Sequence, residues 1–299
     1  MTAAADRPGS APDLVMQAPA KVNLFLEVLG RRDDGFHELE TVMQAIDLCD
    51  TIEFWNRPGR QFTISVSGGE APADESNLAL RAAKTLAEAS GSPSGVHLHI
   101  EKRIPAGGGL GGGSSDAATT LRGLNRLWSL GISKPDLEQL GAGLGSDVNF
   151  FLTGGMAVCR GRGEIVEALP LNYPVRYILN IPQLHVSTKD IYASLGIRLT
   201  DPPNSCTSLI EAVAQGDLRV ASDRLFNRLE EPVFEAHPEL AAAKKRLAET
   251  GVWGALLSGS GATVYAVVDP GKIEGLGGKL RKQVRSGALI EAGPLKGWG

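Results

Sequence analysis

The chain has 299 residues, of which 42% are hydrophobic and 21% charged, a balance typical of a globular protein with one large domain or two smaller ones. Its net charge of −4 disfavours a nucleic-acid-binding protein, which would normally show a basic face. Cys49, Cys159 and Cys206 are too few for a disulfide framework, and no apolar run is long enough to span a membrane. We therefore expect a cytoplasmic protein with no nucleic-acid or membrane partner.

The first part of the chain predicts a tail and four strands. Residues 1–14, rich in Ala, Pro and Asp, are expected to form a disordered tail. Alternating apolar side chains then predict strands over 15–29 and 36–46. Two further strands, 51–55 and 61–67, are expected to pair with each other across a short turn.

The middle of the chain alternates between helices and strands. Asn77 is expected to cap a helix that ends near residue 89, and a strand follows over 95–101. A glycine-rich stretch precedes a helix over 114–130, and Ser133 is expected to cap a shorter helix. A sharp turn then leads into a strand over 156–160.

The last part of the chain is richer in helices. Strands are expected over 164–169, 175–181, 252–257 and 262–268 and near 288, and helices over 189–195, 208–215, 219–229, 238–250 and 271–284. Strands that pair early, with helices grouped between them, predict an α+β fold in two domains, 15–160 and 161–299.

Six glycines occupy the seven positions 107–113, between a predicted strand and a predicted helix. Glycine loses the most backbone entropy on folding, so such a run is kept where bare backbone must bend sharply or approach a ligand. Free N–H groups and the helix dipole converge there, which suits a phosphate. The expected nucleotide-phosphate site comprises Pro105, Ala106, Gly107, Gly108, Gly109, Leu110, Gly111, Gly112, Gly113, Ser114 and Ser115.

Other interpretations of the glycine run fit less well. A flexible linker would carry Ser, Pro or charges between its glycines and would not join a strand to a helix. Gly107, Gly109 and Gly112 match the spacing of a dinucleotide-binding fingerprint, but no acidic residue ends a following strand at the usual offset. A P-loop is excluded because no Gly-Lys-Ser/Thr follows, and the sequence lacks the motifs of protein kinases.

Three other stretches carry polar residues that suit chemistry. Lys21 and Asn23 share one face of the first strand, although an edge strand with a solvated face would look the same. Asp147 lies in a tight turn before an expected strand, where a turn or helix-capping aspartate is the alternative. Backing of phosphates, or an ordinary hairpin turn, is expected of Ser258, Gly259, Ser260 and Gly261.

A phosphate cradle, a lysine and a carboxylate are what phosphoryl transfer from ATP to an alcohol requires. In sequence order, the stretches 19–24, 105–117 and 256–262 resemble the three motifs of the GHMP small-molecule kinases. The resemblance extends from about residue 18 to 268. The tripled glycines on both sides of Leu110, together with Gly35-Phe36-His37, are typical of the branch whose acceptor is a cytidine diphosphate sugar alcohol.

The resemblance implies a two-lobed α+β fold, with an N-terminal lobe like domain 2 of ribosomal protein S5 and a ferredoxin-like α/β sandwich as C-terminal lobe. It also implies transfer of the ATP γ-phosphate to the 2-hydroxyl of the acceptor's methylerythritol moiety, in non-mevalonate isoprenoid biosynthesis. ATP is the expected co-substrate and Mg²⁺ the expected metal ion. The sequence leaves open whether the protein is a monomer or a homodimer.

The resemblance also implies roles for individual residues. Asp147 matches the proposed base, Lys21 the partner that orients or polarises the hydroxyl, and Asn23 a residue that lines the same pocket. Asn77 and Lys102 are expected near the adenosine. Two aromatic rings, an imidazole and a threonine are expected to recognise the cytosine: Phe36, His37, Thr188 and Tyr192.

The chain departs from the family pattern at several positions. Asn149 stands where Pro is common, and Phe36 and Tyr192 stand where the family often has Tyr and Phe. The acidic Mg²⁺ ligand of mevalonate-type relatives has no evident counterpart, so no metal ligand is assigned. His97 and His99 share a strand face but have no third ligand nearby, and we expect them to be structural.

Two alternatives remain. Another GHMP kinase, acting on homoserine or mevalonate, would have no base to clamp, and the set of Phe36, His37 and Tyr192 argues against it. A non-catalytic nucleotide sensor on the same fold would not need both Lys21 and Asp147.

Overall fold

The computed structural model describes residues 8–169, 175–195, 204–273, 276 and 288–295. The chain forms two compact units, and each is discontinuous in sequence. The first comprises Met1–Ala20, Leu48–Ala106 and Gly111–Thr153, and the second comprises Lys21–Asp47, Gly107–Leu110 and Gly154–Gly299. The strands β1 (Leu14–Arg31) and β2 (His37–Arg57) supply residues to both units. The division into domains 15–160 and 161–299 stays a prediction.

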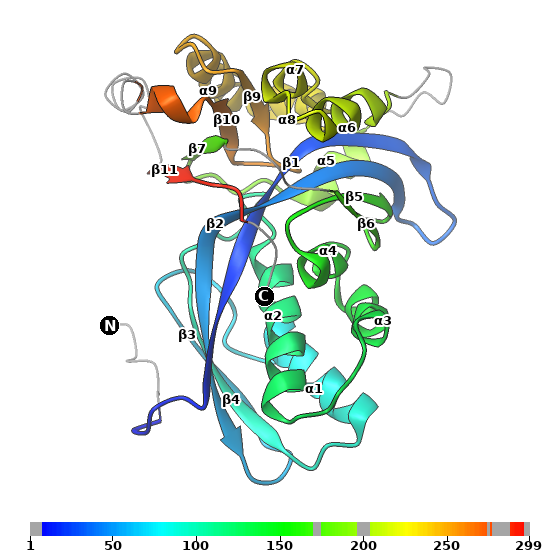
Figure 1. Ribbon diagram of the computed structural model, residues 1–299, viewed down its shortest axis with the longest axis vertical. Helices are drawn as coiled ribbons and strands as arrows, with labels where there is room; N and C mark the ends of the chain where they lie inside the picture. The colour runs from blue at the N-terminus through cyan, green and yellow to red at the C-terminus, as the bar shows by residue number, and fades with distance from the viewer. Residues whose placement is uncertain (1–7, 170–174, 196–203, 274–275, 277–287, 296–299) are drawn as a thin grey trace. The chain divides into compact units, whose positions relative to one another are not determined.

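In the first unit, helices pack against a small sheet (Figure 1). The strand β4 (Gly95–Glu101) pairs antiparallel with the second half of β2 and parallel with β3 (Phe62–Ser67). The side chains of Asn77 and Ser133 cap two of the helices, as predicted. The helices are α1 (Leu78–Ser90), α2 (Gly112–Leu127), α3 (Lys134–Leu144) and α4 (Val148–Thr153).

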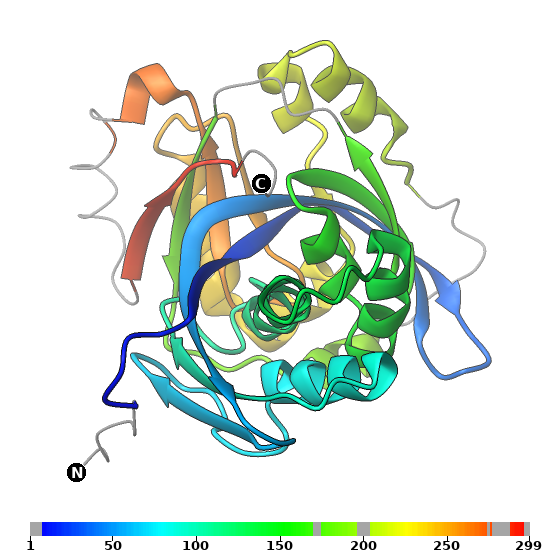
Figure 2. The same ribbon diagram turned by 60° about the horizontal axis from the view of Figure 1, so that its bottom comes forward.

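A glycine brings α2 close to the sheet of this unit. A Cβ added at Gly123 would come within 2.6 Å of the Phe54 ring on β2, so a larger residue would push the helix away. The helices α1 and α2 pack side by side (Figure 2), and both carry small and apolar residues that are fully buried, among them Ala83, Leu86 and Leu121. This packing fixes the start of α2, where the glycine run ends.

The second unit contains an antiparallel sheet with the strand order β11–β7–β10–β9. In addition, β5 pairs with the first half of β2 and with β6, and β8 pairs parallel with β1. The strands are β5 (Met156–Gly161), β6 (Ile165–Leu169), β7 (Arg176–Ile181), β8 (Phe226–Asn227), β9 (Gly254–Leu257), β10 (Val264–Val268) and β11 (Ala288–Ala292). The helices are α5 (Thr188–Ser194), α6 (Thr207–Ala214), α7 (Leu218–Ser222), α8 (Glu230–Ala236) and α9 (Pro238–Ala248), with a short 3₁₀ helix at Pro270–Lys272.

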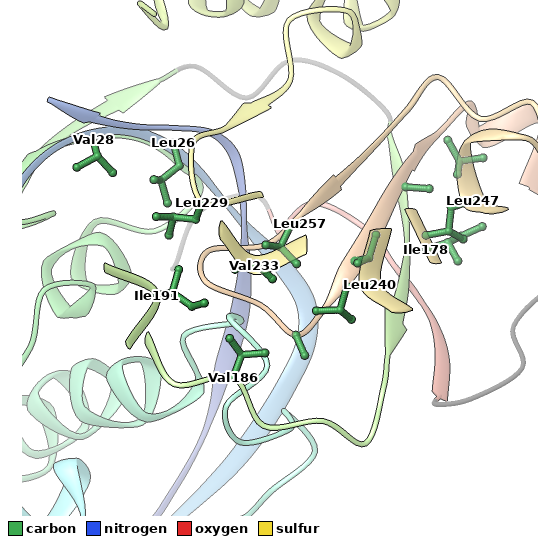
Figure 3. Close-up of a cluster of buried hydrophobic side chains, with 14 of the residues drawn as sticks. Leu26, Val28, Ile178, Val186, Ile191, Leu229, Val233, Leu240, Leu247 and Leu257 are labelled. Atoms are coloured by element: carbon green, nitrogen blue, oxygen red, sulfur yellow. The ribbon is translucent and has the colours of Figure 1, made fainter. Parts of the chain in front are cut away.

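A cluster of buried apolar side chains holds the elements of the second unit together (Figure 3). Leu26 from β1, Leu229 before α8 and Leu257 from β9 belong to it, and none is more than 4% exposed. Burial of each such side chain contributes about 1.5–3 kcal/mol to the free energy of unfolding. The cluster therefore anchors the turn that follows Leu257.

Several sequence predictions of secondary structure are wrong. The stretches 51–55 and 61–67 are strands, but β4 lies between them, so they do not pair with each other. The strands expected at 36–46 and 51–55 are parts of one continuous strand, His37–Arg57, because the Asp50 carboxylate is satisfied by Lys102 and by backbone N–H groups and does not interrupt it.

Two further corrections concern helices. The strand expected at 156–160 after the turn at Asp147 is present as β5, but the sequence did not predict the helix α4 between them. The run 148–152 is uniformly buried, so it shows no periodicity that would indicate a helix. The helix expected over 219–229 ends at Ser222, and Phe226–Asn227 instead pairs with β1. The helix expected over 271–284 lies largely outside the described residues.

In the described part of the chain, no helix has both the length and the apolar character needed to cross a membrane.

Candidate active site

Lys21 is held rigidly within the second unit. Its side chain is 4% exposed, and its Nζ donates to Asn23 Oδ1 at 2.7 Å and to the Gly109 carbonyl oxygen at 2.8 Å. Lys21 and Asn23 lie two residues apart on β1, so the alternation of the strand places both side chains on one face, as predicted. These contacts fix the position of the ammonium group next to the glycine run.

Asn23 is oriented by its own partners. Its Nδ2 donates to Thr41 Oγ1 at 2.9 Å, and the Thr41 hydroxyl donates in turn to the Phe25 carbonyl at 2.6 Å. The Tyr265 hydroxyl donates to the Asn23 carbonyl at 2.7 Å. Because Thr41 engages the amide nitrogen, the amide oxygen points at Lys21. Asn23 therefore orients the lysine, in addition to the pocket-lining role expected from the sequence.

The glycine run adopts backbone conformations that other residues avoid. Gly107, Gly109 and Gly111 have φ values of 67°, 73° and 72°. A Cβ at Gly109 would collide with the carbonyl oxygen of Ser258, and one at Gly107 would come within 2.7 Å of His185 Nδ1. Both bare backbone and positive φ are therefore required here, as the sequence indicates.

The start of α2 has no side-chain cap among the described residues. Gly111 is its N-cap and provides no side-chain hydrogen bond, and within the described chain the first turn contains no acidic residue. The first N–H groups of a helix have no partner inside it, and the helix dipole adds partial positive charge. The arrangement suits an anion such as a nucleotide phosphate.

Behind this helix lies a buried ion triad. Lys102 Nζ donates to Asp50 Oδ2 at 2.5 Å and to Asp116 Oδ2 at 2.7 Å. The other oxygen of Asp50 accepts from the backbone N–H groups of Arg103 and Ile104. The triad ties α2, through Asp116, to β2 and to the end of β4.

Burial and mutual attraction shift the pKa values of two members of the triad. It raises the pKa of Asp116 to about 7, an effect that the Lys102 charge only partly offsets and the Asp50 charge reinforces. Burial lowers the pKa of Lys102, but attraction to the two carboxylates outweighs it and the net shift is upward. Asp116 Oδ1 is buried and accepts no hydrogen bond from the described residues.

The two residues expected near the adenosine have structural partners. The ammonium of Lys102 is engaged by the triad, and the Asn77 side chain accepts from Ala79 N at 2.9 Å and donates to the Pro72 carbonyl at 2.7 Å. Their role toward adenosine stays a prediction.

Asp147 lies in the turn that precedes α4 and is half-buried. Its carbonyl oxygen accepts from Phe151 N at 3.3 Å, so its backbone begins the helix. Asn149, two residues further on, is 6% exposed on α4. The sequence places the carboxylate at an element boundary, and the structure agrees, although the element that follows is a helix.

The aromatic residues expected around the cytosine make ring contacts within the second unit. The rings of His37 and Tyr192 have centroids 4.9 Å apart at 32°, whereas the Phe36 ring is 49% exposed beneath the guanidinium of Arg162. Burial, with a smaller contribution from the charge of Arg31, lowers the pKa of His37. A neutral imidazole is favoured, and it both donates and accepts hydrogen bonds.

Thr188 is joined to the turn after β9. Its hydroxyl lies 2.7 Å from that of Ser260, and the Ser258 hydroxyl donates to the Gly109 carbonyl at 2.9 Å. The Gly108 carbonyl also accepts from Thr263 N at 3.2 Å. The structure thus brings the Ser258–Gly261 turn, residues 107–110 of the glycine run and Lys21 together.

His97 and His99 belong to a hydrogen-bonded ladder between β4 and β3. Both ring nitrogens of each lie within 3.2 Å of a hydroxyl, provided by Thr63, Ser65 and Ser67. Among the described residues, no group of three or more His, Cys, Asp or Glu side chains is arranged to hold a metal ion. The histidines pair the two strands, which agrees with the structural role expected of them.

Sequence reasoning missed Thr41, Asp50, Arg162 and Asn227. The clearest available signal was Asp50, a charged residue within an otherwise apolar strand region, because such a residue needs a buried partner. Nothing in the sequence indicated a role for Asn227, because the helix predicted over 219–229 included it, whereas the observed helix ends at Ser222.

Comparison with known proteins identifies the fold. A model of the GHMP kinases N terminal domain matches residues 77–156, and one of the GHMP kinases C terminal region matches 209–286. A crystal structure of a 4-(cytidine 5'-diphospho)-2C-methyl-D-erythritol kinase is 36% identical, with a TM-score of 0.79, over 96% of this chain and all of that one. A homoserine kinase from Cytophaga hutchinsonii, 18% identical with a TM-score of 0.75 over 97% of this chain and 96% of that one, shares the fold. The predicted GHMP kinase fold is confirmed.

Sequence similarity identifies the branch of the GHMP kinases to which the chain belongs. The 4-diphosphocytidyl-2-C-methyl-D-erythritol kinase of Bacillus cereus (strain B4264) is 42% identical over 255 residues, which are 85% of this chain and 88% of the relative. A protein of the same name from Bacillus anthracis matches to the same extent. The chain therefore belongs to the 4-diphosphocytidyl-2-C-methyl-D-erythritol kinase family of the GHMP kinases.

Proposed function

We propose that the protein transfers the γ-phosphate of ATP to the 2-hydroxyl of 4-diphosphocytidyl-2-C-methyl-D-erythritol, giving the 2-phosphate and ADP. The name of the relatives at 42% identity supports this substrate. The observation that carries the proposal is the buried Lys21 ammonium, fixed by Asn23 and by a carbonyl of the glycine run.

The ATP phosphates would bind at the glycine run and the start of α2. Gly107, Gly109 and Gly111 expose bare backbone, and the first N–H groups of α2 have no side-chain cap. These groups provide preorganised donors for the charge that develops on the transferred phosphoryl group. The turn at Ser258–Gly261, which is hydrogen-bonded to Gly109, would support the same phosphates.

Asp147 would act as the general base. As the 2-hydroxyl oxygen forms its bond to the γ-phosphorus, the bond from phosphorus to the β-bridging oxygen breaks and ADP leaves. The hydroxyl proton passes to the Asp147 carboxylate, and the Lys21 ammonium stabilises the negative charge on the oxygens involved.

Mg²⁺ would arrive with ATP. The ion typically keeps several water molecules and binds substrate phosphates together with one or two carboxylates, and when bound it neutralises phosphate charge. We assign no protein ligand to it, because the described residues offer no ready cluster.

The cytidine end of the acceptor would be recognised by Phe36, His37, Thr188 and Tyr192. The His37 and Tyr192 rings already contact each other, and a neutral imidazole can pair with both donor and acceptor edges of a base. We therefore expect cytosine to stack in this region, with Phe36 as a half-exposed second face.

Steady-state kinetics with three acceptors tests the proposal. The wild-type protein should phosphorylate the cytidylated methylerythritol and leave homoserine and mevalonate untouched. Asp147→Asn should lower kcat by about 10²–10⁴-fold, the usual loss of a general base, with ATP affinity retained. The assignment of Asp147 is wrong if a folded Asp147→Asn protein keeps more than about half of the wild-type kcat. Turnover of homoserine or mevalonate alone would overturn the substrate.

A further inference from the structure

Asn227 is a buried side chain whose two amide N–H groups are both directed at one turn. It is 4% exposed and lies on β8. Its Nδ2 donates to the carbonyls of Leu257 and Gly259, at 2.9 and 2.8 Å, while its Oδ1 accepts from Leu229 N at 2.9 Å. An amide has two N–H donors and an acceptor, so this one side chain can donate to the carbonyls of the residues on both sides of Ser258.

The turn held in this way contacts the site of Lys21. The Ser258 hydroxyl donates to the Gly109 carbonyl at 2.9 Å, and the same carbonyl accepts from Lys21 Nζ at 2.8 Å. A Cβ at Gly259 would lie 3.4 Å from Lys21 Nζ and 3.5 Å from Asn23 Oδ1. The backbone that Asn227 fixes is therefore packed directly against the ammonium group and its partner.

Both carbonyls belong to buried residues, and Leu257 lies with Leu26 and Leu229 in the buried apolar cluster shown in Figure 3. A buried carbonyl that loses its donor is destabilising, so the turn would shift to find another donor. Asn227 itself cannot follow, because β8 pairs with β1 at Leu26 and Arg228 N donates to the Leu26 carbonyl at 2.8 Å.

We infer that Asn227 is a positioning residue for phosphoryl transfer: its amide sets the backbone of Ser258–Gly261 and, through Gly109 and Gly259, the place of the Lys21 ammonium. This inference rests on the proposed function, because the role of Lys21 is part of it. Asn227 acts through the turn and touches neither substrate nor reacting atoms.

The test compares Asn227→Ala with Val233→Ala. Val233 is fully buried in the same cluster, on α8, so its truncation loosens the unit without removing a hydrogen bond from the turn. Both variants should melt at lower temperature than the wild type. In Asn227→Ala, kcat should fall by about 10–100-fold, the scale of a misplaced catalytic group, with the KM of the cytidylated acceptor changed by less than about twofold. Val233→Ala should keep the wild-type kcat.

Binding of adenylyl imidodiphosphate, measured by calorimetry, separates this inference from the proposed function. Its affinity should fall in Asn227→Ala and not in Val233→Ala, whatever acceptor the enzyme uses. A folded Asn227→Ala protein with wild-type kcat and analogue affinity would overturn the inference, whereas lack of turnover by the wild type would overturn only the function.

A second variant covers the case in which Asn227→Ala does not fold. Ser258→Ala leaves Asn227 in place and removes the hydrogen bond from the turn to Gly109. It should reproduce the loss of kcat and of analogue affinity with little change in acceptor KM. Wild-type values for both in Ser258→Ala would contradict the inference just as directly.

Discussion

The ammonium groups of two buried lysines have different kinds of partner. Lys102, in the first unit, lies between the carboxylates of Asp50 and Asp116, whereas Lys21, in the second unit, donates to an amide oxygen and a backbone carbonyl. The carboxylates make Lys102 part of a buried charge network in the first unit, whereas the oxygens of Asn23 and Gly109 orient the Lys21 ammonium beside the glycine run. We therefore expect the first lysine to serve mainly the fold and the second mainly a ligand.

Replacing each lysine by methionine tests this contrast most strongly. Lys102→Met leaves two carboxylates buried without their cation, so the free energy of unfolding should fall by about 3–5 kcal/mol. Lys21→Met should change stability less but lower kcat by about 10²–10³-fold, the loss typical of one preorganised electrostatic group. Urea denaturation and steady-state kinetics on both variants give the two readouts.

The controls lie within the same pair of variants. If Lys102→Met unfolds no more readily than Lys21→Met, the ion triad does not hold α2 as described. If kcat falls equally in both, measured where each is fully folded, the distinction between a structural and a functional lysine fails.

The triad also predicts that the free energy of unfolding depends on pH, with an effect smaller than that of Lys102→Met. The pKa of Asp116 is about 7 in the folded protein and 3.8 in the unfolded chain, with Asp50 and Lys102 as the charged groups facing it. The folded state therefore binds this proton more tightly, and its stabilising contribution is present below about pH 4 and is lost as the pH rises through about 7. Asp116→Asn cannot ionise, so its free energy of unfolding should fall less between pH 5 and pH 8 than that of the wild type. Equal falls, measured by urea denaturation, would contradict the assignment.

The sequence indicated candidate site residues but not the connections between them. Lys21, Asn23 and the glycine run were recognisable because polar or bare residues in an apolar context need a reason. The contact of Gly109 with the Ser258 carbonyl joins residues 149 positions apart, and no local pattern encodes it. The fold class followed from the same motifs.

Errors in the predicted elements have two physical causes. The run at 148–152 is buried on all sides, so neither helical nor strand periodicity is visible in it. The break expected before residue 51 does not occur because Asp50 finds buried partners, and tertiary contacts outweigh local propensity. Asn227 was hidden by the same limitation, since its partners are all in other elements or loops.

The residues proposed to recognise cytosine offer a test that is independent of the two lysines. Tyr192→Ala should raise the KM of the cytidylated acceptor by about 5–150-fold, equivalent to 1–3 kcal/mol of lost stacking. The effect should exceed that of Phe36→Ala, because Tyr192 also supports the His37 ring whereas Phe36 is half exposed. Tyr192→Phe keeps the ring and should retain the wild-type KM. A parallel rise in the KM of ATP would mean that Tyr192 holds the fold rather than the base.

The smallest expected effect distinguishes glycines that the structure needs from one that it does not. At Gly113, the second residue of α2, the nearest atom to an added Cβ is Leu78 Cδ1 at an ordinary 3.6 Å. Gly113→Ala should therefore raise the free energy of unfolding by about 0.5–1 kcal/mol, the usual difference between the two residues in a helix. At Gly109, with φ of 73°, a methyl group would displace the Ser258 carbonyl, so Gly109→Ala should lower both stability and kcat. Urea denaturation of the two variants measures the contrast. If the two variants have the same free energy of unfolding, the close approach of Gly109 to Ser258 is not what fixes the Gly109 carbonyl, which accepts from Lys21.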